Sequence, residues 1–199
     1  MHKIPYKIFI TGAPGSGWAY IARWLENKIN ANISHRNSIS RSFTFYDSSQ
    51  SKNWEIHTGV FFGTGMEFSA DLDVIDEPYS GDGTCIYRSH EWVYKIDEIR
   101  ERFPDAWIIF VNRLDDNCFD WWKHVGGFDI TYPNYSWYQD DEMMLQKIKE
   151  QNEIMLQFCT EHNIEWTEYR TMFDDITPMI NEYESYIAIY KPEKEENNV

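Results

Sequence analysis

The sequence predicts an α/β fold with three layers, in which a central parallel sheet is flanked by helices. The first observation is a short apolar segment at 7–11, which is followed by a glycine loop and then by apolar residues at helical spacing. The second is the segment 107–111, which is apolar at successive positions, as expected for a strand buried on both faces of a sheet. The third is the alternation of such segments with helical stretches, which favours parallel strands joined by helices.

The remaining elements are assigned from apolar spacing and from residues that end helices. Residues 31–82 show no clear period and are expected to form an irregular excursion, and residues 126–138 to form an aromatic loop. The other expected elements are a strand at 84–88, helices at 93–103, 115–124 and 140–162, a last strand at 164–167 and a helix at 174–183.

Length, charge and cysteine content restrict the class of protein. We interpret residues 1–190 of the 199 as one domain and residues 191–199 as a charged, disordered tail. The net charge of −15 argues against binding to nucleic acid or to an anionic membrane. No apolar run is long enough to span a membrane, and there is no signal-peptide pattern. The three cysteines are far apart, which excludes a CxxC zinc site and favours a reducing, cytoplasmic location.

The glycine loop between the first strand and the first helix is typical of a phosphate-binding site. Glycines let backbone N–H groups turn toward an anion, and the helix N-terminus adds positive potential. In the ATP- and GTP-binding version, a Lys and a Ser or Thr follow the last glycine, whereas Trp18 and Ala19 stand here. We therefore expect an anion-binding loop without magnesium, and a magnesium-dependent kinase or a glycine turn without a ligand remain as alternatives. The loop comprises Gly12, Ala13, Pro14, Gly15, Ser16, Gly17, Trp18 and Ala19.

Two further candidate motifs lie at the ends of the other predicted strands. Arg88 ends the strand at 84–88 and His90 comes two residues later, while Arg113 follows the strand at 107–111. Ligands bind at the carboxyl ends of parallel strands, so these residues and the glycine loop are expected to share one edge of the sheet.

Taken in order, these motifs resemble the sulfotransferases that use 3′-phosphoadenosine 5′-phosphosulfate (PAPS), a family with a P-loop-like fold. Residues 14–20 are similar to the family loop Pro-Lys-Ser-Gly-Thr-Thr-Trp, and residues 87–90 to a family strand that ends in Lys-Thr-His. Residues 108–113 resemble the strand whose final Arg contacts the 3′-phosphate, and residues 164–175 more weakly resemble a late strand followed by Tyr-Glu-Asp-Leu. The resemblance covers residues 7–175.

The resemblance implies transfer of a sulfuryl group from PAPS, as co-substrate, to a hydroxyl or amine of a small-molecule or glycan acceptor, without a metal. It implies that the glycine loop holds the phosphosulfate group, that His90 is the catalytic base and that Arg113 binds the 3′-phosphate. We also assign Arg88, at the end of the strand that precedes His90, as a catalytic residue. The alternatives are a structural, packed His90 and a surface salt bridge between Arg113 and the acidic residues that follow it. The acceptor and the oligomeric state stay open.

Three departures from the family pattern favour a second hypothesis. Gly15 replaces the loop Lys, Trp121 stands where a Ser is usual, and the Arg-Lys-Gly segment is missing. Arg36, Arg41 and Arg88 are candidate substitutes for the lost contacts. The second hypothesis is a nucleotide- or anion-binding module without transfer activity. Residues that either line an acceptor pocket or are structural or solvent-exposed are His35, His57 and Glu67. Aromatic residues expected to wall an acceptor pocket or stack on adenine, or alternatively to pack on the core, are Phe61, Phe62, Phe128, Tyr132, Tyr135 and Trp137.

Overall fold

A computed structural model gives the arrangement of most of the chain. The expected helix at 174–183 and most of the expected tail lie outside the described residues. The residues described are 4–34, 42–47, 52–57, 61–62, 67–68, 72–73, 75–76, 79–124, 126–129, 132–133, 137–168 and 184–192.

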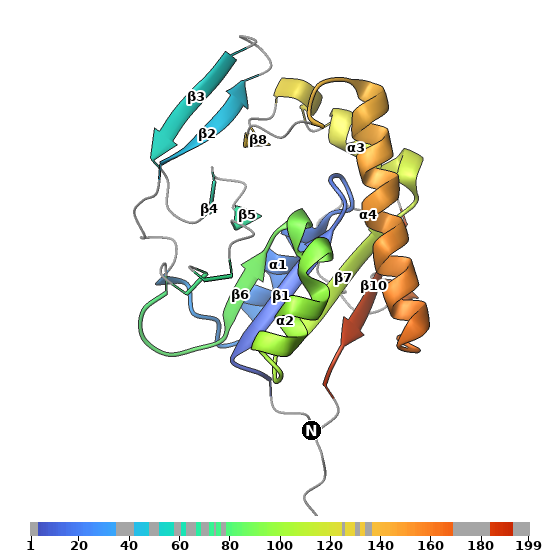
Figure 1. Cartoon of the computed structure of the whole chain (residues 1–199). Coiled ribbons are helices and arrows are strands. Elements are labelled where there is room, and N and C mark those ends of the chain that lie inside the picture. Colours follow the sequence, from blue (N-terminus) through green and yellow to red (C-terminus); the bar gives the residue numbers. More distant parts are fainter. Residues whose placement is uncertain are drawn as a thin grey trace, which may run out of the picture.

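A five-stranded mixed sheet forms the centre of the molecule, with strand order β6-β1-β7-β10-β9 (Figure 1). Strand β1 pairs in parallel with β6 on one side and with β7 on the other. Strand β10 is antiparallel to both of its neighbours, β7 and β9. The strands are β1 (Lys7–Gly12), β6 (Cys85–Arg88), β7 (Trp107–Arg113), β9 (Thr167–Glu168) and β10 (Ser185–Tyr190).

The expectation of a parallel sheet is confirmed for β6, β1 and β7 and is wrong for the sheet as a whole. Residues 185–190, to which we assigned no element, form the antiparallel strand β10. The last strand expected at 164–167 is a two-residue edge strand, β9. A short apolar run indicates a strand but not its direction, because backbone groups pair in either orientation.

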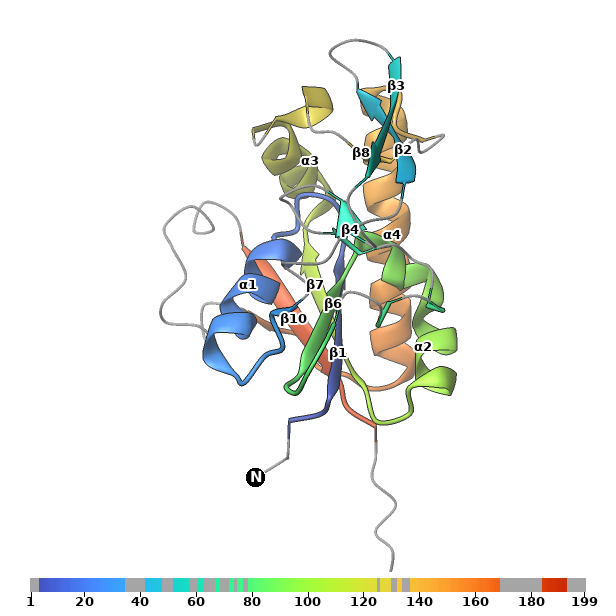
Figure 2. The same cartoon turned by 90° about the vertical axis from the view of Figure 1, so that its left-hand side faces the viewer.

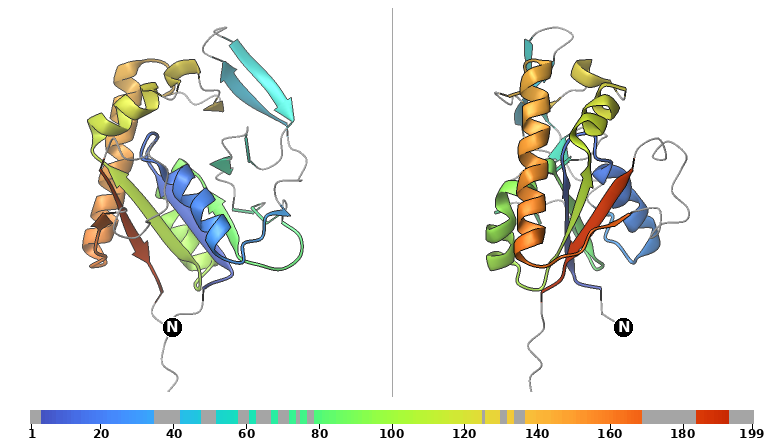
Figure 3. Two further views of the ribbon diagram at one scale, coloured as in Figure 1. Left: turned by 180° about the vertical axis from the view of Figure 1, so that it is seen from behind. Right: turned by 90° about the vertical axis from the view of Figure 1, so that its right-hand side faces the viewer.

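Helices cover both faces of the sheet (Figure 2). Helix α1 (Trp18–Lys28) packs on one face, where Ile21 contacts the side of the sheet that carries Ile8 and Ile10. Helices α2 (Ile96–Arg102) and α4 (Asp141–Glu161) and the 3₁₀ helix η3 (His90–Lys95) pack on the other (Figure 3). Within the described part of the chain, no helix is both long and apolar enough to cross a bilayer.

A third apolar cluster ties the glycine loop to the helices beyond the edge of the sheet. It joins Ala13 of the loop to Cys118 and Trp122 of α3 (Asp115–His124) and to Met144 and Ile148 of α4. All five side chains are buried. The loop is therefore held in place by packing against α3 and α4 as well as by its two flanking elements.

The interpretation of residues 31–82 as irregular is wrong for several short segments. Strands β2 and β3 form an antiparallel pair, visible as a ribbon away from the main sheet in Figure 1, and β2 also pairs with β8. Serine and asparagine interrupt the apolar pattern of these segments, so the pattern gives no period. The elements are β2 (Ser42–Asp47), β3 (Lys52–His57), β4 (Phe61–Phe62) and β5 (Glu67–Phe68), with η4 (Gly127–Asp129) and β8 (Tyr132–Pro133) in the expected aromatic loop.

Candidate functional site

The glycine loop lies at the carboxyl end of β1 and opens directly into α1, as the sequence predicts. Gly12, the last residue of β1, pairs with Val111 near the end of β7. A side chain at Gly12 has no room, because its Cβ would lie 2.5 Å from the Val111 carbonyl and 2.4 Å from Ser16 Oγ. The first glycine thus lets the loop turn tightly over the edge of the sheet.

The N-terminus of α1 offers free backbone donors. Gly17 precedes the helix in a left-handed conformation (φ 93°), which favours glycine, and no side chain among the described residues caps the helix. The first turn contains no acidic residue. The N–H groups of Trp18 and Ala19 have no intrahelical acceptor, since they belong to the first turn. Gly17 and Ala19 are partly exposed, so an anion can approach them.

Arg113 and Ser185 hold the carbonyl groups of the loop. Arg113 is buried and donates hydrogen bonds from Nη1 to the Gly15 carbonyl (2.7 Å) and from Nε to Ser185 Oγ (2.9 Å). Ser185 Oγ in turn donates to the Ser16 carbonyl (3.4 Å). A trans peptide directs the following N–H away from its carbonyl, so the N–H of Gly17 points away from β10. Arg113 is therefore buried beneath the loop, not at the surface as in the salt-bridge alternative.

Gly15 stands where the sulfotransferase loop that residues 14–20 resemble has a Lys, and the structure leaves no space there for a side chain. Its φ is +83°, and a Cβ at this position would lie 1.9 Å from the backbone oxygen of Cys118. The missing ammonium group is thus a consequence of how closely the loop packs on α3. A cationic side chain that contacts an anion bound at the loop must therefore come from another part of the chain.

Arg88 lies in a buried ion pair on the α1 face of the sheet. Its Nη2 is 3.3 Å from Oε1 of Glu26 in α1, and both side chains are almost fully buried. The structure therefore brings Arg88 to α1 and gives it a carboxylate partner. Its expected catalytic role stays a prediction.

His90 begins η3 beside the end of β1, where the sequence predicts a base. Thr11 Oγ1 donates a hydrogen bond to the His90 carbonyl (3.3 Å), which ties η3 to the strand that leads into the loop. The imidazole is buried and meets the ring of Trp137 edge-on at 5.6 Å. Its Nδ1 lies 3.0 Å from Oε1 of Glu91 and 2.9 Å from Nε2 of Gln151 in α4.

Opposing effects set the pKa of the Glu91 carboxyl. Partial burial raises the pKa, whereas the hydrogen bond and charge of His90 and the charge of Lys147 lower it. The lowering effects together are larger, so the pKa lies below its ordinary value. Glu91 is consequently ionised at neutral pH.

Three residues that the sequence analysis missed complete this region: Ser185, Glu91 and Gln151. Ser185 opens an apolar segment, SYIAIY, whose composition is a strand signal. Gln151 is a buried polar residue within the apolar stripe of α4 between Ile148 and Met155. A polar residue in such a stripe signals a specific partner, but it does not say which one.

Several expected site residues fall where the structure gives no side-chain detail. Arg36, Arg41, His35 and Tyr135 lie outside the described residues. The strands β3, β4, β5 and β8 contain His57, Phe61, Phe62, Glu67 and Tyr132. Phe128 and Trp137 pack around Tyr138 in the cluster that supports the loop. Among the residues the structure describes, no three His, Cys, Asp or Glu residues are grouped as metal ligands.

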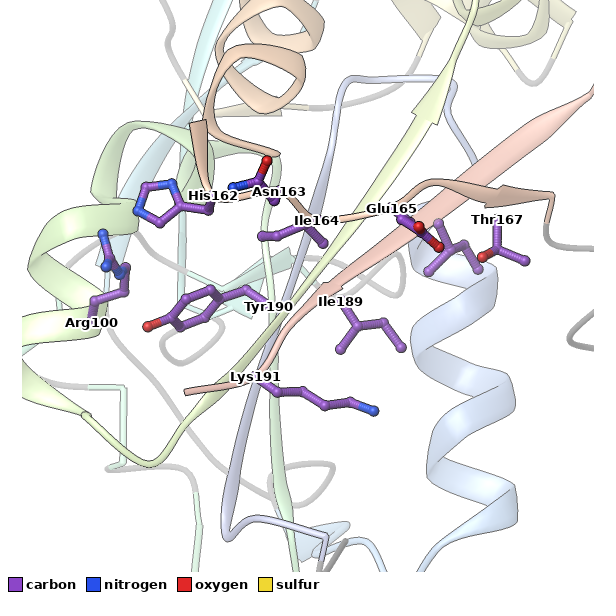
Figure 4. A pocket seen from close by; sticks show the side chains of 10 residues that line it. Arg100, His162, Asn163, Ile164, Glu165, Thr167, Ile189, Tyr190 and Lys191 are labelled. Atoms are coloured by element: carbon purple, nitrogen blue, oxygen red, sulfur yellow. The ribbon is translucent and has the colours of Figure 1, made fainter. Parts of the chain in front are cut away.

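A cavity of about 640 Å³ lies at the other end of the sheet (Figure 4). Arg100, His162 and Tyr190 line one end of it, as Figure 4 shows. Tyr190 pairs with Ile108 near the start of β7, whereas the loop adjoins the end of that strand. No residue of the glycine loop lines this cavity, so it is separate from the candidate site.

The glycine loop, the uncapped N-terminus of α1 and the buried His90 therefore form the candidate site. Comparison with protein-family models, with curated protein sequences and with solved structures finds no match to this chain.

Proposed function

We propose that the glycine loop binds the phosphosulfate group of PAPS and that the protein transfers the sulfuryl group to a hydroxyl or amine acceptor. The observation that carries this proposal is the uncapped N-terminus of α1 at the carboxyl end of β1, with the loop carbonyls tied back by Arg113 and Ser185. Such a terminus favours an anion through both its orphan N–H groups and its dipole. The resemblance to sulfotransferases supplies the identity of the anion.

The loop contains a polar group that suits a phosphate or sulfate oxygen. Ser16 Oγ is buried and has no hydrogen-bond partner within the described part of the chain. A buried hydroxyl left unbonded costs about 1–3 kcal/mol, and an anionic oxygen would supply its missing partner. The N–H groups of Gly17, Trp18 and Ala19 would bind the remaining oxygens. A loop ammonium on the bridging oxygen has no counterpart, because Gly15 has no space for one.

In the proposed reaction an acceptor oxygen or nitrogen attacks sulfur in line with the leaving phosphate oxygen. The new bond to sulfur forms as the bond between sulfur and the phosphate oxygen breaks, and 3′,5′-adenosine diphosphate leaves. His90 takes the acceptor's proton, which is the contribution of a general base. The loop N–H groups stabilise the negative charge that develops on the leaving phosphate.

A binding module without transfer activity is the second candidate. The contacts of two arginines favour it, because both guanidinium groups already bond to the protein itself. Arg88 pairs with Glu26, and Arg113 donates a hydrogen bond to the Gly15 carbonyl. In that case the loop still binds the nucleotide, but no acceptor is sulfated.

Thermal-shift titration with 3′,5′-adenosine diphosphate, compared with ATP with and without magnesium, tests the proposal. At about 100 times the dissociation constant, one-site binding adds about 2.7 kcal/mol, which for a chain of this size raises Tm by roughly 5–10 °C. Ala19→Asp places a carboxylate in the first turn of α1 and should abolish the shift, while the neutral isostere Ala19→Asn should retain it. Equal shifts in the two variants would place the nucleotide elsewhere.

Transfer is tested separately, with PAPS and a panel of acceptors. His90→Ala should reduce turnover by orders of magnitude and leave binding of the bisphosphate nearly unchanged. Unchanged turnover would remove His90 from the mechanism. Binding of the bisphosphate with no transfer in the wild-type protein would select the binding module, and a shift that requires ATP and magnesium would select the kinase alternative.

A further inference from the structure

The Nδ1 atom of His90 has two close partners that make opposite demands on it. Glu91 Oε1 lies 3.0 Å away and, as a carboxylate oxygen, can only accept a hydrogen bond. Gln151 Nε2 lies 2.9 Å away and can only donate one. A neutral imidazole Nδ1 carries either a hydrogen or a lone pair, so it cannot satisfy both neighbours in this orientation.

The orientation of the Gln151 side-chain amide resolves the conflict. Its Oε1 is buried and has no hydrogen-bond partner within the described part of the chain. The amide oxygen and nitrogen have nearly the same shape, so a half-turn of the amide costs no space. The turn places Oε1 against Nδ1, where it accepts from an Nδ1–H group. Both neighbours of Nδ1 then act as acceptors, and the unbonded buried oxygen gains a partner at 2.9 Å. The turn gives up only the longer hydrogen bond, of 3.5 Å, from Gln151 Nε2 to Glu91 Oε1.

Charge favours the same assignment. Glu91 is ionised at neutral pH, and a hydrogen bond to a charged group is about twice as strong as one between neutral groups. In the other tautomer, the carboxylate oxygen would face a nitrogen lone pair at 3.0 Å, which is repulsive. The low exposure of the imidazole strengthens both effects, because little water screens them.

We propose that Glu91 is a positioning residue that holds His90 in the Nδ1–H tautomer, with the Gln151 amide oxygen as second acceptor and the Nε2 lone pair as the base. The consequence of this tautomer for catalysis rests on the proposed function, whereas the assignment of the tautomer does not depend on it. Glu91 keeps its charge throughout, while Nε2 accepts the proton of the acceptor group. The carboxylate then faces an imidazolium and stabilises it.

The tautomer is measured directly by long-range ¹H–¹⁵N NMR of the labelled full-length protein, without any substrate. The His90 signals are assigned by their loss in His90→Gln, and spectra are recorded up to a pH at which the imidazole is neutral. Wild type is expected to show Nδ1 protonated and Nε2 unprotonated. Glu91→Gln should shift the population toward Nε2–H, the form that free histidine prefers. Glu153→Gln, the same change at an exposed position of α4, should have no effect.

Gln151→Met separates the contributions of the two neighbours. It removes the amide at nearly constant volume and should leave the Nδ1–H tautomer in place, since Glu91 alone can hold it. An Nε2–H tautomer in the wild type overturns the proposal. So does a tautomer that is lost in Gln151→Met and kept in Glu91→Gln, because Gln151 is then the positioning group.

Transfer kinetics complete the test and distinguish this proposal from the proposed function. Glu91→Gln should lower kcat about 10- to 100-fold with a small change in KM, by analogy with the loss of a carboxylate that orients a metal-binding histidine. An equal loss of kcat with an unchanged tautomer would mean that Glu91 acts on the substrate, which contradicts a positioning role. If the wild type transfers nothing, the proposed function fails while the spectra still decide the tautomer.

Discussion

Substitution of Gly15 by alanine is the sharpest test of how the loop is built. Two separate effects oppose a side chain there. The backbone is in the left-handed region (φ +83°), and a Cβ would lie 1.9 Å from the carbonyl oxygen of Cys118 and 2.7 Å from its carbonyl carbon. Because backbone cannot rotate away as a side chain can, either the loop or α3 must move.

The two effects are of similar size. A non-glycine residue in the left-handed region costs about 1–2 kcal/mol. Overpacking against a rigid neighbour costs about 1–3 kcal/mol more. Gly15→Ala is therefore expected to lower the free energy of unfolding by about 2–5 kcal/mol, which lowers Tm by about 4–20 °C. Gly15→Lys, which introduces the Lys of the sulfotransferase loop that residues 14–20 resemble, should destabilise the protein at least as much.

The chain provides a matched control in Gly81. Its φ is +75°, but a Cβ there would meet nothing within 4 Å, so Gly81→Ala tests the backbone strain without the clash. We expect that control to cost only about 1–2 kcal/mol. The assay is urea unfolding followed by circular dichroism, with the three proteins compared side by side. Equal losses in the two variants would show that the Cys118 backbone does not lie against Gly15.

Three further predictions concern the buried polar groups. Arg113→Met removes the donor to the loop carbonyl and should lower the free energy of unfolding in urea by about 2–5 kcal/mol. Ser185→Ala should lower it by about 1–2 kcal/mol. A negligible loss in both variants would contradict the hydrogen bonds described. Glu26→Leu leaves the Arg88 charge buried without its carboxylate and should cost about 3–5 kcal/mol, part of which the double variant with Arg88→Met should recover. Burial raises the pKa of the Cys118 thiol to about 12. Its contribution to stability is therefore complete below the ordinary thiol pKa and declines as the pH rises toward 12, and the thiol should react with an alkylating reagent at pH 8 only after unfolding in urea.

Local pattern was enough to predict the elements that carry strong periodicity. The strand at 107–111 is buried on both faces because its residues are apolar in succession, and β7 confirms it. The helix expected at 140–162 corresponds to α4, whose buried residues include Met144, Ile148 and Met155. The direction of β10 and its place in the sheet depend on its pairing with β7, and the spacing of apolar residues does not reveal that pairing.

The candidate site was predictable in position and not in its internal contacts. The sequence places the glycine loop, His90 and Arg113 at one edge of the sheet, and the order of the strands agrees. The bonds of Arg113 reach Gly15 and Ser185, which are 98 and 72 residues away in the chain. Contacts at such separations follow from the three-dimensional arrangement, so spacing in the sequence does not reveal them.

The bond between Ser185 and Ser16 also has a consequence for the timing of biosynthesis. The two residues are 169 positions apart, so β1 and α1 leave the ribosome long before the hydroxyl that orients the Ser16 peptide exists. At about 5–20 residues per second, that interval is roughly 10–30 s. A nascent chain can form helix α1 early, because the contacts within a helix are local, whereas β1 must wait for its partner strands β6 and β7. The loop between them reaches its final orientation only when β10 has been made and has paired with β7.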